Sequence, residues 1–298
     1  MSHVADDPRF HAVVDPDAPV EPLLTGLGIT EGTVWHPREQ HLVFSDLTAS
    51  TVWRWTARDG ATMLRRPSNI TNGNTLDREG RLLSCEHATS CVSRLESDGR
   101  FVRVLATHWQ GKAFNSPNDI VCDRQGRIWF TDPLFGRTSP RVGVLRPPEL
   151  GFQGVFRIET DGSVTRIAAD YAEPNGLCLT TDEQALLVND HGRGHIRRYA
   201  IHADGSVWGG EVFAQIPADD SGKPDGMKVD VDGRVYCTGA GGIHVLAPDG
   251  QRLGLLRMPD KTRNFCFGGD DGRTLFLAVH GGIWRLRVKV AGVLPHVP

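Results

Sequence analysis

Six segments of the chain repeat one pattern, in which a polar turn is followed by an apolar run with a defined end. Four of the six runs end at an acidic residue, and successive ends lie 40, 46, 58, 49 and 40 positions apart. Such spacing is typical of one four-stranded blade of a β-propeller per repeat. The end positions are Asp46, Glu86, Asp132, Asp190, Gly239 and Val279.

A second series of signals supports the repeat. Asp-Gly dipeptides favour tight hairpins, because glycine adopts the positive φ angle that such turns need, and they occur in five of the repeats. Each lies between the third and the fourth run of its repeat, so the pattern predicts four antiparallel strands in each. The dipeptides are Asp59-Gly60, Asp98-Gly99, Asp161-Gly162, Asp204-Gly205 and Asp249-Gly250.

The second and sixth repeats show how the strands are expected to follow one another. Residues 70–106 hold four apolar runs in a row, whereas the sixth repeat has only three, at 264–268, 275–279 and 283–288. Its missing outer strand is predicted to come from Val20–Thr25, so that the two ends of the chain close one ring without an exposed sheet edge.

The sequence therefore predicts an all-β fold, a six-bladed β-propeller with four antiparallel strands per blade, closed by an N-terminal strand. Helical periodicity is hard to find anywhere, and the 34 glycines concentrate at the turns. A pair of β-sandwiches is the alternative, because it would explain the strand spacing but not the regular unit. We expect residues 1–19 to be a polar N-terminal extension and residues 20–298 to be a single propeller domain.

Composition excludes several classes of partner. The 298 residues include 39% hydrophobic and 23% charged residues and carry a formal net charge of −3, so neither nucleic acid nor a membrane is expected as a partner. Residues 1–19 contain no apolar signal region, and no apolar run approaches the roughly 20 residues of a membrane span. We therefore expect a soluble, cytoplasmic protein that is a monomer or a weak homodimer.

Six cysteines are spread along the chain without the Cys-x-x-Cys spacing of metal or redox motifs. Five of them lie within apolar runs, so we expect reduced, buried thiols, as is usual in a reducing compartment. A bridge between Cys85 and Cys91 is the one local alternative.

The start of each repeat carries a polar residue in the same register. Counting back 14 or 15 positions from the end of each second strand reaches a carboxylate or a carboxamide in all six repeats. First strands line the central channel of a propeller, so these side chains are expected to converge at one face. A local turn explains any one of these phrases, but not six at corresponding positions. The residues are Glu31, Asn72, Asn118, Asn175, Asp225 and Asn264.

Two carboxylates and four carboxamides form a set of oxygen donors without histidine or cysteine. Hard cations such as Ca²⁺, Mg²⁺ and Mn²⁺ prefer oxygen ligands, whereas Zn²⁺ usually takes nitrogen or sulfur. Glu31 and Asp225 supply two negative charges, which would neutralise one divalent ion. We predict one divalent cation, Ca²⁺ first, with Mg²⁺, Mn²⁺ or Zn²⁺ as alternatives.

Seven short phrases resemble the SMP-30/gluconolactonase/luciferin-regenerating-enzyme-like six-bladed propellers, and within them the microbial gluconolactonases. The resemblance covers nearly the whole chain, from about Glu31 to Arg287. It implies hydrolysis of a sugar lactone, glucono-1,5-lactone to gluconate, in carbohydrate metabolism. The phrases are Asn72–Asp77, Cys85–His87, Asn115–Ile120, Phe130–Pro133, Gly151–Arg157, Glu173–Gly176 and Pro224–Asp230.

Carried over position by position, the resemblance implies that Glu31, Asn175 and Asp225 bind the metal. Asn118 would be a fourth ligand or a substrate contact, and Asp225 is the candidate catalytic base. Further substrate contacts are predicted at Asn72, His87, Asp132 and Asn264.

Two positions depart from the family pattern. Animal members have an arginine two positions before the counterpart of Asn118, where this chain has Ser116, so the substrate contact must come from elsewhere. A related branch with phosphofluoridate hydrolase activity holds a second, central Ca²⁺ partly with an aspartate, where this chain has Lys228. We therefore expect one ion, with the lysine amine in the space of the second.

The expected mechanism is metal-assisted hydrolysis. The cation would polarise the lactone carbonyl, and a carboxylate, Asp225 first, would accept a proton from the attacking water. Hydroxide bound to the cation is the rival nucleophile, because coordination lowers the basicity of an aspartate. The long connection 133–153, with its three arginines, is predicted to be a lid over the site.

Two other functions fit the same sequence. One is metal-dependent hydrolysis of a different aldonolactone, an aryl ester or a phosphotriester, because the cation site would be common to all of them. The other is a non-enzymatic binding propeller with a structural ion. Neither a GxSxG motif nor a phosphate-binding loop occurs, which disfavours serine esterases and nucleotide enzymes.

Overall fold

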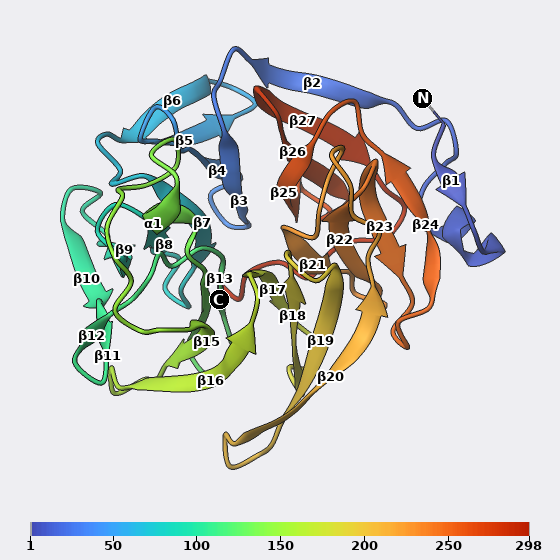
Figure 1. Ribbon diagram of the computed structural model, residues 1–298. Helices are drawn as coiled ribbons and strands as arrows, with labels where there is room; N and C mark the ends of the chain where they lie inside the picture. The colour runs from blue at the N-terminus through green and yellow to red at the C-terminus, as the bar shows by residue number, and fades with distance from the viewer. Residues whose placement is uncertain (1, 298) are drawn as a thin grey trace. The chain divides into compact units, whose positions relative to one another are not determined.

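The computed structural model describes residues 2–297, and most of its regular structure is antiparallel β-sheet (Figure 1). Contacts divide the chain into two compact units. Unit 1 comprises the residues up to 30 together with 176–294, and unit 2 comprises 31–175 together with the residues from 295 onward. Each unit contains three sheets of at least four strands, built mainly from consecutive strands, which is the blade connectivity that the repeat predicted.

Unit 2 holds the first three repeats. Each repeat forms a four-stranded sheet whose strands pair in chain order, and the strands predicted within residues 70–106 are confirmed to within one residue. A short hairpin and a helix of four residues are added between the sheets. The elements are β3 (Thr30–His36), β4 (His41–Asp46), β5 (Thr51–Thr56), β6 (Gly60–Arg65), β7 (Thr71–Leu76), β8 (Leu82–Glu86), β9 (Cys91–Leu95), β10 (Val102–Ala106), β11 (His108–Trp109), β12 (Lys112–Ala113), β13 (Ile120–Cys122), β14 (Ile128–Asp132), α1 (Phe135–Thr138), β15 (Gln153–Ile158) and β16 (Val164–Tyr171).

Unit 1 holds the last three repeats, and two N-terminal strands join their outer edges. The predicted closing strand is confirmed: Val20–Thr25 pairs with the third strand of the last sheet, and the blue β2 lies beside the red β27 in Figure 1. The elements are β1 (Val4–Ala5), β2 (Val20–Thr25), β17 (Pro174–Leu179), β18 (Ala185–Asp190), β19 (His195–Ile201), β20 (Val207–Gln215), β21 (Met227–Val229), β22 (Val235–Gly239), β23 (Gly242–Leu246), β24 (Arg252–Arg257), β25 (Thr262–Gly268), β26 (Thr274–Val279) and β27 (Gly282–Arg287).

The N-terminal segment contributes more to the fold than a polar extension would. β1 pairs with β24, and a 3-10 helix, η1 (Pro8–Ala12), follows it. Phe10, Val13 and Val14 are buried in the main core of unit 1. These three apolar residues give an otherwise polar segment enough buried surface to pack on the sheet. The single-domain boundary at 20–298 stays a prediction.

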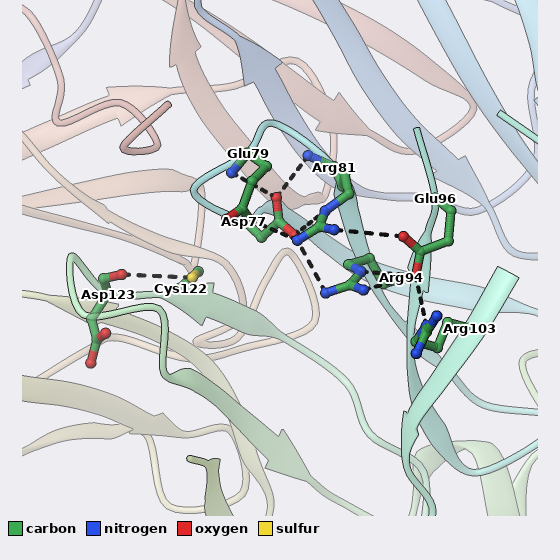
Figure 2. A network of polar contacts seen from close by, with 8 residues as sticks. All are labelled: Asp77, Glu79, Arg81, Arg94, Glu96, Arg103, Cys122 and Asp123. Carbon is green, nitrogen blue, oxygen red and sulfur yellow. Dashed lines mark hydrogen bonds and ion pairs between the residues drawn. The ribbon is translucent and has the colours of Figure 1, made fainter. Parts of the chain in front are cut away.

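A repeated turn shapes the hairpin between the first and the second strand of three sheets. In each, an aspartate accepts two backbone N–H groups of the turn, and the arginine four positions later donates to the same carboxylate. Around Asp77 the network widens, since Arg81 also reaches Glu79 and Glu96 (Figure 2). Because the Asp-x-x-Gly-Arg phrase satisfies these amides locally, it specifies where one strand ends and the next begins. The pairs are Asp77 and Arg81, Asp123 and Arg127, and Asp230 and Arg234.

All six cysteines are free thiols, as predicted, and five of them are buried. The alternative bridge between Cys85 and Cys91 is not formed. Within residues 2–297, no helix is long and apolar enough to cross a membrane.

Candidate active site

Glycines pack the first strands of neighbouring sheets against one another in unit 2. Gly32 approaches Asn72 so closely that a Cβ atom on it would lie 2.0 Å from the Asn72 carbonyl oxygen. Gly73 approaches Asn118 in the same way, with 2.4 Å to the carbonyl oxygen, and donates its N–H to that oxygen at 2.8 Å. Only glycine permits these approaches. The glycines after Glu31 and Asn72 therefore set the spacing of these first strands.

Thr131 extends this series of contacts to Asn175. Its carbonyl oxygen accepts the Asn118 N–H at 2.8 Å, and its hydroxyl group donates to the Asn175 carbonyl oxygen at 2.7 Å. The four predicted residues of unit 2 thus lie in chain order on successive first strands whose backbones are linked. All four are buried, with exposed fractions between 3% and 5%. They are Glu31, Asn72, Asn118 and Asn175.

The same packing occurs in unit 1 around Asp225, which is half-buried. A Cβ atom on Gly176 would lie 1.8 Å from the Asp225 carbonyl oxygen, and one on Gly226 would lie 2.5 Å from Oδ1 of Asn264. Asn189 Nδ2 donates to the Asp225 carbonyl oxygen at 2.5 Å. Within unit 1, the structure therefore places the starts of the last three first strands side by side.

Sequence reasoning missed the side chains that hold these first strands. In four repeats, the residue just before the end of the second strand donates a side-chain hydrogen bond to a backbone carbonyl oxygen on the first strand of the next sheet. Each of these bonds ties the second strand of one sheet to the backbone at the start of the next sheet. They could have been predicted from the sequence, because a residue that can donate a hydrogen bond stands at the same place in four repeats, one position before the end of the second strand. The four residues are Ser45, Cys85, Thr131 and Asn189.

The predicted site residues have the chemistry of ligands for a hard cation. Glu31 is buried, and its Oε2 accepts the N–H of Gly32 at 3.1 Å. Among residues 2–297, no three His, Cys, Asp or Glu side chains gather at one point. A cation site in this chain would therefore draw on carboxamide oxygens as well as carboxylates, and such a mixed oxygen set is usual for Ca²⁺.

His87 connects the predicted lid, residues 133–153, to Asn72. Its Nδ1 lies 2.7 Å from the carbonyl oxygen of Val142, so Nδ1 carries the proton and donates it. Nε2 is then an acceptor, 3.3 Å from Nδ2 of Asn72. Burial lowers the pKa of His87 to about 4, which keeps the imidazole neutral. The side chain predicted to touch substrate is thus a buried group that orients the Asn72 amide.

The lid is anchored by two of its three arginines. Arg137 is buried and donates to three backbone carbonyl oxygens. Arg146 donates to three groups of the 87–90 turn, at 2.5, 2.6 and 3.4 Å. Both guanidinium groups are engaged by the protein, so the exposed Arg141 is the lid arginine that remains open to solvent.

Asp132 is fully buried. Its Oδ2 accepts the backbone N–H of Asn115 at 2.8 Å, and burial raises its pKa to about 7. The acids that end other second strands, such as Asp46 and Asp190, instead accept N–H groups of the turn that follows them. Asp132 differs because the lid follows it in place of a tight turn. Its carboxyl group therefore positions the segment before Asn118 and faces no open surface.

His191 of unit 1 contacts the residue that precedes Asp225. Its Nδ1 donates to the carbonyl oxygen of Pro224 at 2.8 Å. Burial is the main cause that lowers the pKa of His191 to about 4, and the positive charges of Lys223 and Lys261 lower it further. A neutral imidazole therefore lies close to two ammonium groups.

Asn264, predicted as a substrate contact, has an exposed fraction of only 2%. Its Oδ1 accepts the N–H of Phe265 at 2.9 Å and lies 3.4 Å from the Lys228 amine. The carboxamide oxygen is therefore engaged within the protein.

Comparison with known proteins places the chain among sugar lactonases. A family model of the SMP-30/Gluconolactonase/LRE-like region matches residues 29–281. The gluconolactonase of Zymomonas mobilis subsp. mobilis is 31% identical, over 96% of this chain and 85% of its own length. The pentonolactonase of Haloferax volcanii is 28% identical, over 87% of this chain and 84% of its own length.

Solved structures agree on the fold. A gluconolactonase from Xanthomonas campestris has a TM-score of 0.89 at 32% identity, over 97% of this chain and 95% of its own. The calcium-binding regucalcin of Agrobacterium tumefaciens reaches 0.77 at 17% identity, over 94% and 97% of the two chains, a likeness of fold alone. With the six antiparallel sheets, these likenesses make the fold a six-bladed β-propeller, as the repeat predicted. Because the family model matches most of the length of this chain, the chain belongs to the SMP-30/gluconolactonase/LRE-like family.

Proposed function

We propose that the protein hydrolyses glucono-1,5-lactone to gluconate in a reaction that requires one divalent cation. The chain is an enzyme of the lactonase class, since both curated relatives described above, which match over most of its length, are lactonases. The observation that carries the proposal is the series of buried oxygen-bearing side chains at the starts of linked first strands. We further propose a cytoplasmic location and a monomeric or weakly dimeric state.

We assign the cation to Glu31, Asn118, Asn175 and Asp225. Two carboxylates match the charge of a divalent ion, and two carboxamides add neutral oxygens. Ca²⁺ fits this set best, Mg²⁺ and Mn²⁺ share its preference for oxygen, and Zn²⁺ fits least because nitrogen and sulfur donors are missing from the set. Substrate hydroxyl groups are assigned to Asn118 and to the two remaining first-strand residues, Asn72 and Asn264.

Asp225 acts as the general base in this proposal. When bound, the cation supplies polarisation of the lactone carbonyl. Asp225 accepts a proton from the attacking water, and Asn189 and Thr238 hold its peptide group through hydrogen bonds of 2.5 and 2.9 Å. Ring opening then converts lactone and water to the aldonate, and one proton is released to the medium.

Proton release from glucono-1,5-lactone, followed with a pH indicator, tests the proposal. We expect turnover above the spontaneous rate, loss of turnover in EDTA, and recovery on addition of Ca²⁺. Thermal unfolding in the same buffers is a second readout, because a ligand that binds only the folded state raises the melting temperature. Turnover that persists without metal would contradict the cation requirement. No turnover with any cation would exclude glucono-1,5-lactone as the substrate.

Replacement of Asp225 by Asn tests the base. We expect kcat to fall by about 10² to 10⁴, because a carboxamide cannot accept the proton, while calorimetry still detects Ca²⁺ binding. Asp220→Asn is the matched control, since Asp220 is an exposed carboxylate of the same unit. An unchanged rate in Asp225→Asn would refute the base role.

A further inference from the structure

The chain uses arginine for most of its positive charge, and only five of its 33 basic residues are lysines. Three of those five, Lys223, Lys228 and Lys261, lie in unit 1 on the segments around Asp225 and Asn264. Lysine is a compact point charge that binds phosphate and similar anions, whereas arginine favours fixed bidentate pairs. This concentration of lysines indicates a binding surface.

The two lysine-bearing segments lie side by side in unit 1. The N–H of Gly226 donates to the carbonyl oxygen of Arg263 at 2.6 Å. Lys223 and Lys261 come from different segments, yet both act on the same imidazole, His191. Their ammonium groups are therefore within electrostatic reach of one point.

Arg263 adds a further positive charge where its strand is distorted. The pairing of β25 with β26 shifts register between Thr262 and Asn264, so Arg263 is the extra residue of a β-bulge. Bulges beside active sites re-aim side chains. Nη1 of Arg263 is buried and has no hydrogen-bond partner among residues 2–297. A buried donor without a partner is unfavourable unless a ligand or water accepts its bond.

None of these cations forms an ion pair with a carboxylate of the described chain. Lys228 Nζ is held by neutral oxygens, the Met227 carbonyl at 2.9 Å and Asn264 Oδ1 at 3.4 Å. Two carboxylates occur in these segments: Asp260 is exposed, and Asp225 is assigned to the cation. We name the four cations the basic rim, which comprises Lys223, Lys228, Lys261 and Arg263.

We propose that the basic rim binds an anionic group of the substrate, so that the preferred lactone also carries a carboxylate, sulfonate or phosphate. The inference rests on the proposed lactone hydrolysis at Asp225. During hydrolysis of a neutral lactone, one negative charge develops, on the carbonyl oxygen. The proposed divalent cation would already stabilise that charge. Four more positive charges exceed what this step requires, but they would attract and orient a substrate that is itself an anion.

Paired substrates test this recognition of charge. The value of kcat/KM is measured for glucono-1,5-lactone and for its 6-phosphate in the wild type, in the double variant Lys223→Met/Lys261→Met, and in Lys289→Met. Lys289 pairs with Asp15 at 2.5 Å, so its replacement removes a positive charge of unit 1 outside the basic rim. In the wild type, we expect kcat/KM for the 6-phosphate to exceed that for the neutral lactone by roughly tenfold or more. This ratio should fall roughly tenfold in the double variant, and also in the wild type at high ionic strength. Lys289→Met should retain the wild-type ratio.

Binding of the hydrolysis products separates this inference from the proposed function. Calorimetry compares 6-phosphogluconate with gluconate in the same three proteins and needs no turnover. Tighter binding of 6-phosphogluconate that is lost in the double variant supports the basic rim. This holds even if the enzyme hydrolyses neither lactone. Absence of hydrolysis would count against the proposed function alone. A wild-type preference near one in both measurements, or an equal loss in Lys289→Met, overturns the inference.

Discussion

Glycine, as much as the polar residues beside it, determines how the candidate site is built. Four of the six carboxylates and carboxamides at the strand starts are followed by a glycine, and the close spacing of the backbones there requires a residue without a side chain. Gly176 is the extreme case, because a Cβ atom there would lie 1.8 Å from the carbonyl oxygen of Asp225. Backbone atoms cannot move aside as the end of a flexible side chain can.

Gly176→Ala should therefore destabilise unit 1 by about 3 kcal/mol or more, since overpacking against backbone forces the strands apart. Gly99→Ala is the control: Gly99 has open space around it and a φ of +67°, so the cost there is only the strain of the left-handed backbone, about 1 kcal/mol. Urea unfolding of both variants measures the difference. Equal losses would show that the close approach at Gly176 does not limit the packing.

The lid is held at its middle and at its end. Arg146 fastens it to the 87–90 turn, and Leu150 and Phe152 pack in or against a core cluster of unit 2. His87 adds a third link, since its imidazole joins the lid carbonyl of Val142 to Asn72. Movement of the lid would therefore change the orientation of a predicted substrate-binding amide.

Arg146→Met should loosen the lid without unfolding the sheets. It removes at least two hydrogen bonds from a charged donor, each worth about 1.5 to 3 kcal/mol, so local opening should increase by roughly a hundredfold or more. We expect faster proteolysis within 133–153 and a raised KM, with kcat changed by less than about twofold because no reacting group is removed. Arg141→Met, in which an exposed arginine of the same lid is replaced, serves as the control. Identical proteolysis of the two variants would argue against the anchoring role.

Buried ionisable groups make the stability of both units depend on pH. Burial lowers the pKa of His41 in unit 2 and of His244 in unit 1 from 6.5 to about 4. Between these values the unfolded chain binds protons that the folded chain does not, so stability is full above pH 6.5 and falls as the pH drops toward 4. Asp132 acts in the opposite sense: its pKa is raised from 3.8 to about 7, so its contribution is lost as the pH rises through that range.

The variant His244→Gln removes one of these titratable groups, so it measures the contribution of His244 to the pH dependence of stability. Glutamine can still donate to the Ala240 carbonyl oxygen, which lies 3.1 Å from Nε2 of His244. Between pH 6.5 and 5 the wild type should lose about 2 kcal/mol more than the variant, because one proton corresponds to about 1.4 kcal/mol per pH unit. Denaturant unfolding at several pH values measures this, with His202→Gln on an exposed turn as the control. A common pH dependence for wild type and His244→Gln would contradict the role of His244.

The strand order and the places of the polar residues could be predicted from the sequence because both depend on residues that are close to one another in the chain. A turn phrase, an apolar run and a residue counted back from its end need no knowledge of distant segments. The same counting showed that the sixth repeat lacks a fourth run, and Val20–Thr25 does supply that strand. The side chains of Ser45, Thr131 and Asn189 stand at a fixed place in the repeat, and the same counting could have found them.

Only the tertiary structure decided what surrounds His87 and Asp132. Both follow or end a second strand, where the sequence predicted substrate contacts, yet His87 is buried against the lid and Asp132 against Asn115. The basic rim has the same origin, since Lys223 and Lys261 precede the first strands of two different sheets of unit 1, and the Gly226 N–H donates to the Arg263 carbonyl oxygen between these segments. Strand and turn patterns arise between residues close in sequence, whereas burial and charge clustering depend on which distant segment folds over a side chain, and the repeat carries no signal for that.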